Sequence, residues 1–431
     1  EPRTDRWNSP LPPSCAGGTD ISMTWRPERR SVAAWASYDL ANTVFALGVA
    51  GLYFPEWLID IEGYRDRDLA FAINAAMIVI IVLAPWLGAR SDHEGRRRPY
   101  LIAATFVSVT ATLFIGGTGP GPSLAFFSLA LVGFHIGSLF YESMLVDVST
   151  DENRGRISGL GVGVGYIGSF IAVIVGRLLI DDFGHAFVFR TLAILFLVFA
   201  IPAFFFIRER PRAPKTGPPP SVNQTLAQVR RSWREAANHR GVVPFLVGRF
   251  FYSDAINTVI GGFLTIFAIE EVGFTRDELE IVLGFGILAS VFGGLGGGRL
   301  TERIGPRRAL HFALYLWMTA WIFGLAAAAA DAKPLGVVLV IMGGFALGTT
   351  WSADRTYMAT ITPPDRYAEF YGLYATVGRF ATILGPLIRA LIVDDAGWGR
   401  ITAMSALFGF LVVSRVILSR VDDTPREWAV T

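Results

Sequence analysis

The chain has 431 residues and a formal net charge of +2, with 52% hydrophobic and 17% charged residues. Soluble domains are about 25% charged, so the composition excludes an ordinary soluble protein and favours a chain embedded in a lipid bilayer. The single cysteine, Cys15, excludes an intrachain disulfide, and the five histidines lack metal-ligand spacing. No metal, cofactor or nucleic-acid partner is expected.

Apolar segments long enough to cross a bilayer as helices recur along the chain. A span needs about 20 apolar residues, and the hydrophobic pattern places candidate spans near 32–57, 68–89, 99–117, 123–147, 157–180, 187–207, 242–269, 279–299, 307–330, 334–360, 367–393 and 398–419. The pattern predicts an all-α integral membrane protein with about twelve transmembrane helices.

The second half of the chain repeats polar features of the first. Residues 39–42 carry an Asp and an Asn three positions apart, and residues 254–257 carry the same pair. The loop at 88–98 likewise has a counterpart at 298–308. A charged residue inside a membrane helix costs on the order of 2.5–3.5 kcal/mol. Its recurrence in the same local pattern indicates a duplicated six-helix unit, an arrangement known in transporters.

The predicted organisation is a tail over 1–30, six-helix bundles over 31–207 and 241–420, a linker over 208–240 between them, and a tail over 421–431. Met23 is a candidate start, so residues 1–22 are left out of the fold prediction. In the linker, one helical face carries Val222, Leu226, Val229 and Trp233. This pattern predicts a short basic amphipathic helix on the membrane surface, and a solvated linker helix is the alternative.

Arginines gather in the loops on one side of the predicted membrane, including 96–98, 154–156, 208–212 and 303–308. The positive-inside rule therefore places both termini and the linker in the cytoplasm. The Arg-rich, Lys-poor composition is typical of a GC-rich bacterial genome, so the expected location is a bacterial inner membrane.

The loop after the second predicted helix resembles the signature of the major facilitator superfamily, Gly-x-x-x-Asp-(Arg/Lys)-x-Gly-Arg-(Arg/Lys). The chain departs from it at His93, where the superfamily prefers a cation. The matching residues are Gly88, Asp92, Gly95, Arg96 and Arg97. Within the superfamily, residues 35–42, 249–254 and 369–374 resemble the vacuolar amino-acid effluxer family associated with autophagy and its bacterial relatives. The resemblance covers the chain from about residue 31, and a monomer is expected.

This resemblance implies a substrate cavity lined by helices 1, 4, 7 and 10. Ionisable groups in membrane helices are functional candidates. The residues expected to bind substrate or an ion are Asp39, Asn42, Glu142, Arg249, Asp254, Asn257, Asp354, Arg355 and, on helix 11, Arg379. Structural hydrogen bonding is the alternative for both Asp39 and Asp254. Glu142 and Arg355 hold equivalent positions in the two halves, so they either form an ion pair or bind the two charges of a zwitterion.

The resemblance also implies a gate at the cytoplasmic helix ends. There, Asp92 would meet a helix N-terminus or an arginine only while that side is closed. The expected gate residues are Gly88, Asp92, Gly95, Arg96 and Arg97, with Glu302, Arg303 and Gly305 in the second half. The alternative is that the arginines only set topology.

The sequence therefore predicts a secondary or facilitative transporter that moves a small polar solute by alternating access. An amino acid or related metabolite is the first candidate substrate, and protons are a candidate coupling ion. One alternative is an exporter of amphipathic drug-like compounds, whose cavity would be lined by aromatic residues and few charges. Another is a receptor or assembly protein with a transporter fold. An enzyme is not expected, because the sequence shows no nucleophile–base pair.

Overall fold

The computed structural model describes residues 27–421, except 65, 213, 215, 220, 222, 223, 225–240, 364, 365 and 383. At a few positions within helices, Arg379 among them, only the backbone is described. The predicted amphipathic helix of the linker lies outside the described residues.

Helices make up almost all of the described chain. In the first half they are α1 (Arg29–Thr43), the π-helical η2 (Val44–Tyr53), α2 (Phe54–Glu56), η3 (Trp57–Ile61), α3 (Asp66–Glu94), α4 (Arg98–Phe114), α5 (Pro120–Ser143), η4 (Met144–Val146) and α6 (Arg154–Phe206). In the second half they are α8 (Val242–Thr258), the π-helical η5 (Val259–Phe263), α9 (Leu264–Glu270), α10 (Arg276–Ile304), α11 (Pro306–Ala329), α12 (Lys333–Ile361), α13 (Tyr367–Phe380), α14 (Leu384–Ala390), η7 (Leu391–Asp395) and α15 (Gly399–Ser419).

Local sequence determines where these helices begin and turn. Proline occupies the first or second position of α4, α5, α11 and α12, where its missing N–H costs no intrahelical hydrogen bond. Thr275 and Glu278 form a capping box at the start of α10. Within α6, Gly184 has a φ of 72°, a conformation that favours glycine, and the chain turns back there. The two ends of α6 consequently lie close together, and Arg210 donates a hydrogen bond to the Ser149 carbonyl.

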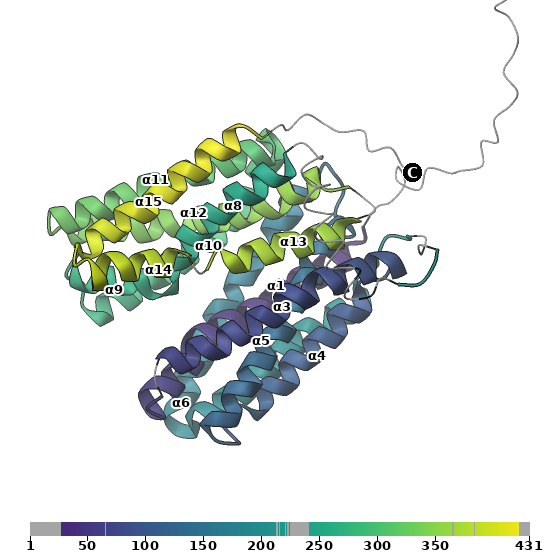
Figure 1. The fold of residues 1–431 in the computed structure, drawn as a ribbon, viewed down its shortest axis with the longest axis horizontal. Helices are drawn as coiled ribbons and strands as arrows, with labels where there is room; N and C mark the ends of the chain where they lie inside the picture. The colour runs from purple at the N-terminus through teal and green to yellow at the C-terminus, as the bar shows by residue number, and fades with distance from the viewer. Residues whose placement is uncertain are drawn as a thin grey trace, which may run out of the picture.

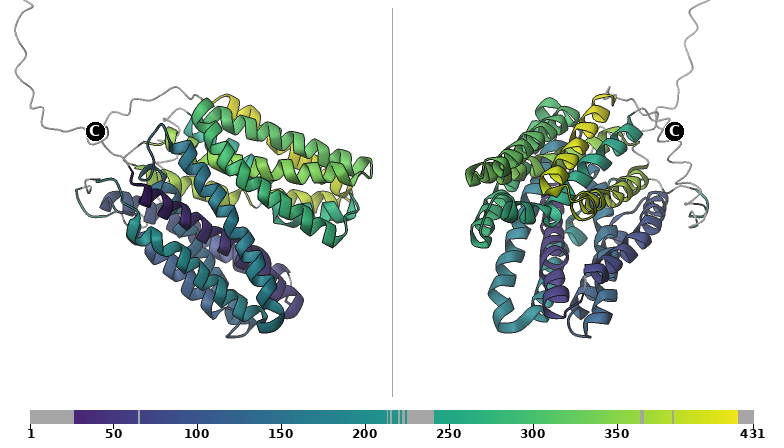
Figure 2. Two further views of the ribbon diagram at one scale, coloured as in Figure 1. Left: turned by 180° about the vertical axis from the view of Figure 1, so that it is seen from behind. Right: turned by 60° about the vertical axis from the view of Figure 1, so that its left-hand side comes forward.

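The described helices form two bundles, α1 to α6 (purple to blue) and α8 to α15 (green to yellow), as Figures 1 and 2 show. In the first bundle α1 packs on α6 and α4 on α5, and in the second α12 packs on α10 and α11. Among the described residues, seven helices are each long and apolar enough to cross a membrane. The predicted all-α membrane fold is confirmed, whereas the count of twelve spans and the domain limits stay predictions.

The bundles draw together at the end where α1 begins and α15 ends, and separate away from it (Figure 1). At this end α6 and α10 cross through glycines: a Cβ on Gly159 would lie 2.3 Å from the carbonyl oxygen of Gly294 and 2.6 Å from the Cα of Gly298. On the other side of the molecule α13 approaches α3, and a Cβ on Gly372 would lie 3.2 Å from the Cα of Pro85. We call the end of the molecule at which α6 crosses α10 the closed end.

Candidate substrate cavity and gate

A cavity of about 450 Å³ lies between the two bundles. Its polar and aromatic lining residues are Asp39, Asn42, Thr43, Phe134, His135, Ser138, Tyr141, Glu142, Tyr166, Arg249, Ser253, Asn257, Trp351, Arg355 and Tyr374. They come from α1, α5, α8 and α12, with further contributions from α6 and α13. Of the nine residues expected at the binding site, the structure brings six to this cavity, whereas Asp254 and Asp354 are not among its lining residues. The side chain of Arg379 lies outside the described part of the chain.

Asp39 and Arg355 form an ion pair that joins the two bundles. Arg355 Nη1 lies 2.9 Å from Asp39 Oδ2, and Nη2 lies 3.3 Å from Oδ1. The guanidinium also donates a hydrogen bond to the Tyr141 hydroxyl at 3.4 Å and lies 5.4 Å from the centre of that ring. The side chains of Arg355 and Asp39 are only 12% and 5% exposed. Two-point contact at low exposure makes this a strong and directional pair.

In this conformation Arg355 pairs with Asp39, and the two alternatives for Glu142 and Arg355, an ion pair in one state or the binding of a zwitterion, stay predictions. Glu142 and Arg355 occupy equivalent positions in the sequence repeat. The relative rotation of the two bundles brings Asp39 of α1 and Tyr141 of α5, rather than Glu142, to Arg355. Glu142 lines the same cavity from α5.

Asp354 lies on the other side of α12 from its neighbour Arg355, since successive helical residues point about 100° apart. It is fully buried within the second bundle. Its carboxylate accepts hydrogen bonds from Arg249 Nε at 3.1 Å, from Tyr374 Oη at 2.6 Å, and from Tyr252 Oη. The Arg249 guanidinium lies 3.6 Å from the centre of the Tyr374 ring. Asp354 therefore positions two cavity-lining residues and does not itself face the solute.

The aromatic residues that line the cavity were not predicted from the sequence. Tyr141, Tyr166, Trp351 and Tyr374 all face the cavity. Trp351 lies one helical turn before Arg355, so the i, i+4 spacing could have identified it. Tyr141 is adjacent to Glu142 and gives no such signal.

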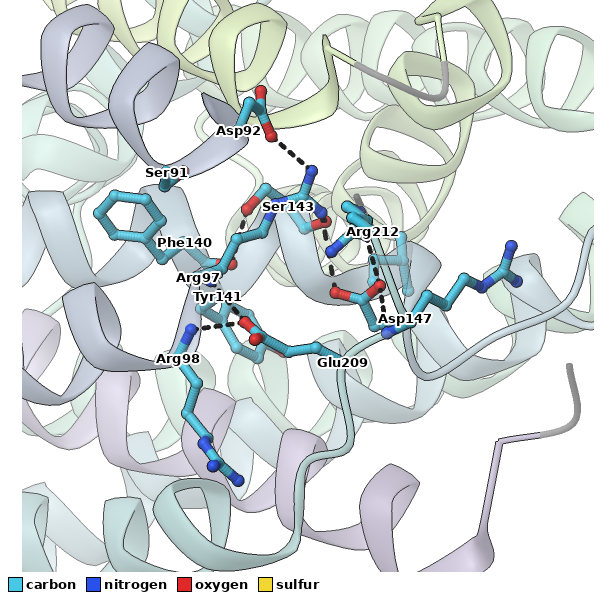
Figure 3. Close-up of polar contacts among 12 residues, drawn as sticks. Ser91, Asp92, Arg97, Arg98, Phe140, Tyr141, Ser143, Asp147, Glu209 and Arg212 are labelled. Carbon is cyan, nitrogen blue, oxygen red and sulfur yellow. Dashed lines mark hydrogen bonds and ion pairs between the residues drawn. The ribbon is translucent and has the colours of Figure 1, made fainter. Parts of the chain in front are cut away.

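A network of charged groups lies at the closed end, in the loop between α3 and α4 (Figure 3). Arg97 is buried and lies 2.8 Å from Asp92 and 3.7 Å from Asp147. It also donates a hydrogen bond to the Ser143 carbonyl at 2.8 Å. Burial alone would lower the pKa of Arg97, but Asp92 and Asp147 outweigh it and the pKa is raised. The arginine thus stays charged and ties the loop to the end of α5.

The segment after α6 completes this network (Figure 3). Glu209 accepts hydrogen bonds from the backbone amides of Arg97 and Arg98 at 2.5 and 2.6 Å, at the start of α4. Arg212 pairs with Asp147. No part in this network was predicted for Asp147, or for Glu209 and Arg212, which lie in the segment predicted as linker.

The predicted gate residues differ in their surroundings. Gly95 has a φ of +69°, and a Cβ there would lie 2.9 Å from the carbonyl oxygen of Arg212, so glycine is required. Arg96 and Arg303 are exposed. Glu302 of α10 accepts a hydrogen bond from the backbone amide of Arg156 at 3.2 Å, across the two bundles. Gly305, at a φ of 85°, separates α10 from α11, and Gly88 accepts a hydrogen bond from Ser91.

Solved structures share this architecture. The chain matches the human organic anion transporter MFSD10 (TETRAN) with a TM-score of 0.69 at 17% identity, covering 91% of this chain and 100% of that one. It matches the E. coli fucose:proton symporter FucP with a TM-score of 0.71 at 13% identity, covering 91% and 98%. Two helical bundles around a central cavity are the fold of the major facilitator class of transporters.

The chain belongs to the family described as vacuole effluxer Atg22 like, whose model matches residues 142–426. It is 24% identical to the uncharacterized MFS-type transporter YxiO of Bacillus subtilis (strain 168), covering 90% of this chain and 94% of that protein. It is 30% identical over 302 residues to autophagy-related protein 22 of Yarrowia lipolytica, covering 61% of this chain and 50% of that one. The resemblance inferred from sequence motifs is confirmed: the chain is a transporter of this class and not an enzyme.

Proposed function

We propose that the chain moves a small carboxylate-bearing solute, with an amino acid as the first candidate, by alternating access between the two bundles. The ion pair between Asp39 and Arg355 supports this most directly. It joins α1 of one bundle to α12 of the other, and both residues line the cavity. A solute that enters the cavity therefore meets the contact that connects the bundles.

A solute carboxylate competes with Asp39 for the Arg355 guanidinium. Glu142 lines the same cavity and supplies a carboxylate for the amine of a zwitterion. When the solute takes Arg355, the link between α1 and α12 is lost and the closed end is weakened. Binding is thereby coupled to the conformational change, since a ligand shifts an equilibrium only through its differential affinity for the two states.

The predicted orientation makes the closed end cytoplasmic, in a bacterial inner membrane. In that orientation the described conformation is open toward the outside and closed toward the cytoplasm. The gate formed by Asp92, Arg97 and Asp147 then stabilises the cytoplasmic seal.

A ligand screen tests the proposal, because a ligand that binds the native state raises its apparent stability. The melting temperature of the purified protein is measured with amino acids and with the corresponding amides. We expect a larger rise with the amino acid, and we expect Arg355→Gln to abolish that difference. Arg415→Gln is the control, since Arg415 contacts Tyr315 on α11 and does not line the cavity. If Arg355→Gln reduces the rise in melting temperature equally for the amino acid and for its amide, Arg355 does not bind the carboxylate of the solute.

The aromatic lining favours a second candidate, an amphipathic organic compound. Phe134, Tyr166 and Trp351 offer flat apolar surfaces beside the charged groups. Stabilisation by bulky aromatic compounds, independent of their carboxylate, would favour this candidate over an amino acid.

A further inference from the structure

Asp254 on α8 is a fully buried carboxylate, with an exposed fraction of 0%. Neither of its oxygens has a hydrogen-bond partner, and the hydroxyls of Ser253 and Thr258 beside it also have none. The backbone amides of Gly385 and Leu384 approach the carboxylate from the start of α14. A buried charge without a partner is costly, so this group of oxygens requires a further explanation.

The oxygens of Asp254 and Thr258 both lie close to Gly385. A Cβ on Gly385 would lie 2.1 Å from Thr258 Oγ1 and 3.0 Å from Asp254 Oδ2. Gly385 is the second residue of α14, directly after the break that separates α14 from α13. Carbonyls at the end of a helix such as α13 lack intrahelical donors. Interrupted membrane helices of this kind provide ion-binding sites in transporters.

The first half of the chain offers an internal comparison. Asp39 and Thr43 are the repeat equivalents of Asp254 and Thr258, and π-helical segments follow both pairs, at η2 and η5. In the first half both polar groups are satisfied: Asp39 pairs with Arg355, and Thr43 donates a hydrogen bond to the Gly165 carbonyl. In the second half neither is satisfied.

The repeat also explains why Asp254 lacks an arginine. The position equivalent to Arg355 in the other half is occupied by Glu142, an acid. The charged groups described on α8 and the elements packed on it have other contacts. Arg249 pairs with Asp354, Arg389 lies 5.9 Å from the Phe263 ring, and Arg415 contacts Tyr315. Among the described side chains, none of these cations is paired with Asp254.

The donor set is one carboxylate with neutral hydroxyls, and all of its donors are oxygens. Oxygen donors suit hard cations, and a single carboxylate balances one positive charge. Ser253 and Asn257, which neighbour these residues on α8, line the solute cavity, so the site lies beside that cavity. Acids in membrane helices commonly mark ion or proton pathways.

We propose that Asp254 and Thr258 form the binding site of a monovalent cation, a proton or Na⁺, that is transported together with the solute. This inference rests on the proposed transport function and adds a second site to it. The acid of the first half, Asp39, is balanced by a fixed cation, Arg355, whereas the acid of the second half binds a mobile one.

Cation binding is measured on the purified full-length protein without solute, which separates this proposal from the transport proposal. Bound ²²Na⁺ and proton uptake after a pH jump are measured for wild type, Asp254→Asn, Thr258→Val and Asp395→Asn. Asp395 is an exposed carboxylate in η7 and serves as the control. We expect wild type and Asp395→Asn to bind one cation, Thr258→Val to bind at least about tenfold more weakly, and Asp254→Asn to lose binding.

The two measurements distinguish the cations: saturable ²²Na⁺ binding identifies Na⁺, and proton uptake without it identifies H⁺. Equal uptake of both cations by wild type and Asp254→Asn would overturn the proposal. If Asp254→Asn does not fold, the cation affinity of Thr258→Val is compared with that of the control Asp395→Asn. Equal affinities would contradict the site. Transport of an identified solute without any cation dependence would refute this inference alone and leave the proposed function intact.

Discussion

Replacing Gly298 with alanine should force the closed end apart. A Cβ there would lie 2.6 Å from the carbonyl oxygen of Gly155 and 2.8 Å from the Cα of Gly159. These atoms belong to the backbone of α6 and cannot rotate away. To reach an ordinary contact of about 3.5 Å, α6 and α10 must separate by roughly 1 Å.

The free-energy cost falls on the closed-end conformation alone, because α6 and α10 belong to different bundles. Overpacking of this kind costs about 1–3 kcal/mol. This range corresponds to a shift of about 5- to 150-fold in the equilibrium between two conformations. Gly298→Ala should therefore populate a state in which the closed end is open.

Spin labels at Glu152 and Arg303 report on this opening, since both are exposed at the closed end, one in each bundle. The labels are introduced in a Cys15→Ser background, and their separation is measured by double electron–electron resonance. We expect Gly298→Ala to add a population at longer distance. Gly284→Ala is the matched control on the same helix, because a Cβ there meets nothing within 4 Å. Identical distance distributions in the two variants would refute the reasoning.

Three further predictions concern the gate at Asp92, the buried carboxylate of Asp354 and the membrane topology. Asp92→Asn removes the nearest carboxylate from buried Arg97 but leaves Asp147 beside it, so it should destabilise the closed end by about 1.5–3 kcal/mol; unchanged melting temperature and unchanged label distances would contradict it. Asp354→Asn leaves Arg249 buried without its carboxylate and should lower stability by about 3–5 kcal/mol in a denaturation assay; a variant of wild-type stability would oppose the structural role. An alkaline phosphatase fused after Pro214 should be inactive if the linker is cytoplasmic, and strong activity would reverse the orientation.

The sequence was sufficient to predict the class of fold and most of the cavity. Hydropathy and the repeat depend on local composition, so the spans and the polar faces of α1, α5, α8 and α12 could be identified. The observed break between α13 and α14 lies just before Gly385 and Pro386. A proline prevents the preceding turn from closing, which makes such a break predictable.

The pairing of charges across the cavity could not be predicted in the same way. Whether Arg355 meets Asp39 or Glu142 depends on the rotation and tilt of one bundle relative to the other. Asp39 and Asp254 look alike in sequence, yet one pairs with an arginine and the other lies buried beside α14. Long-range packing determines this difference, and no local pattern reports it.

The most direct test of the account is solute counterflow in proteoliposomes. Vesicles are preloaded with an unlabelled amino acid that stabilises the purified protein, and the labelled form is added outside at low concentration. The account predicts a transient accumulation of label in wild type and in Arg415→Gln, and a much smaller one in Arg355→Gln. Stabilisation by the amino acid without any counterflow in wild type would show that the chain binds the solute without moving it, and would contradict the central claim.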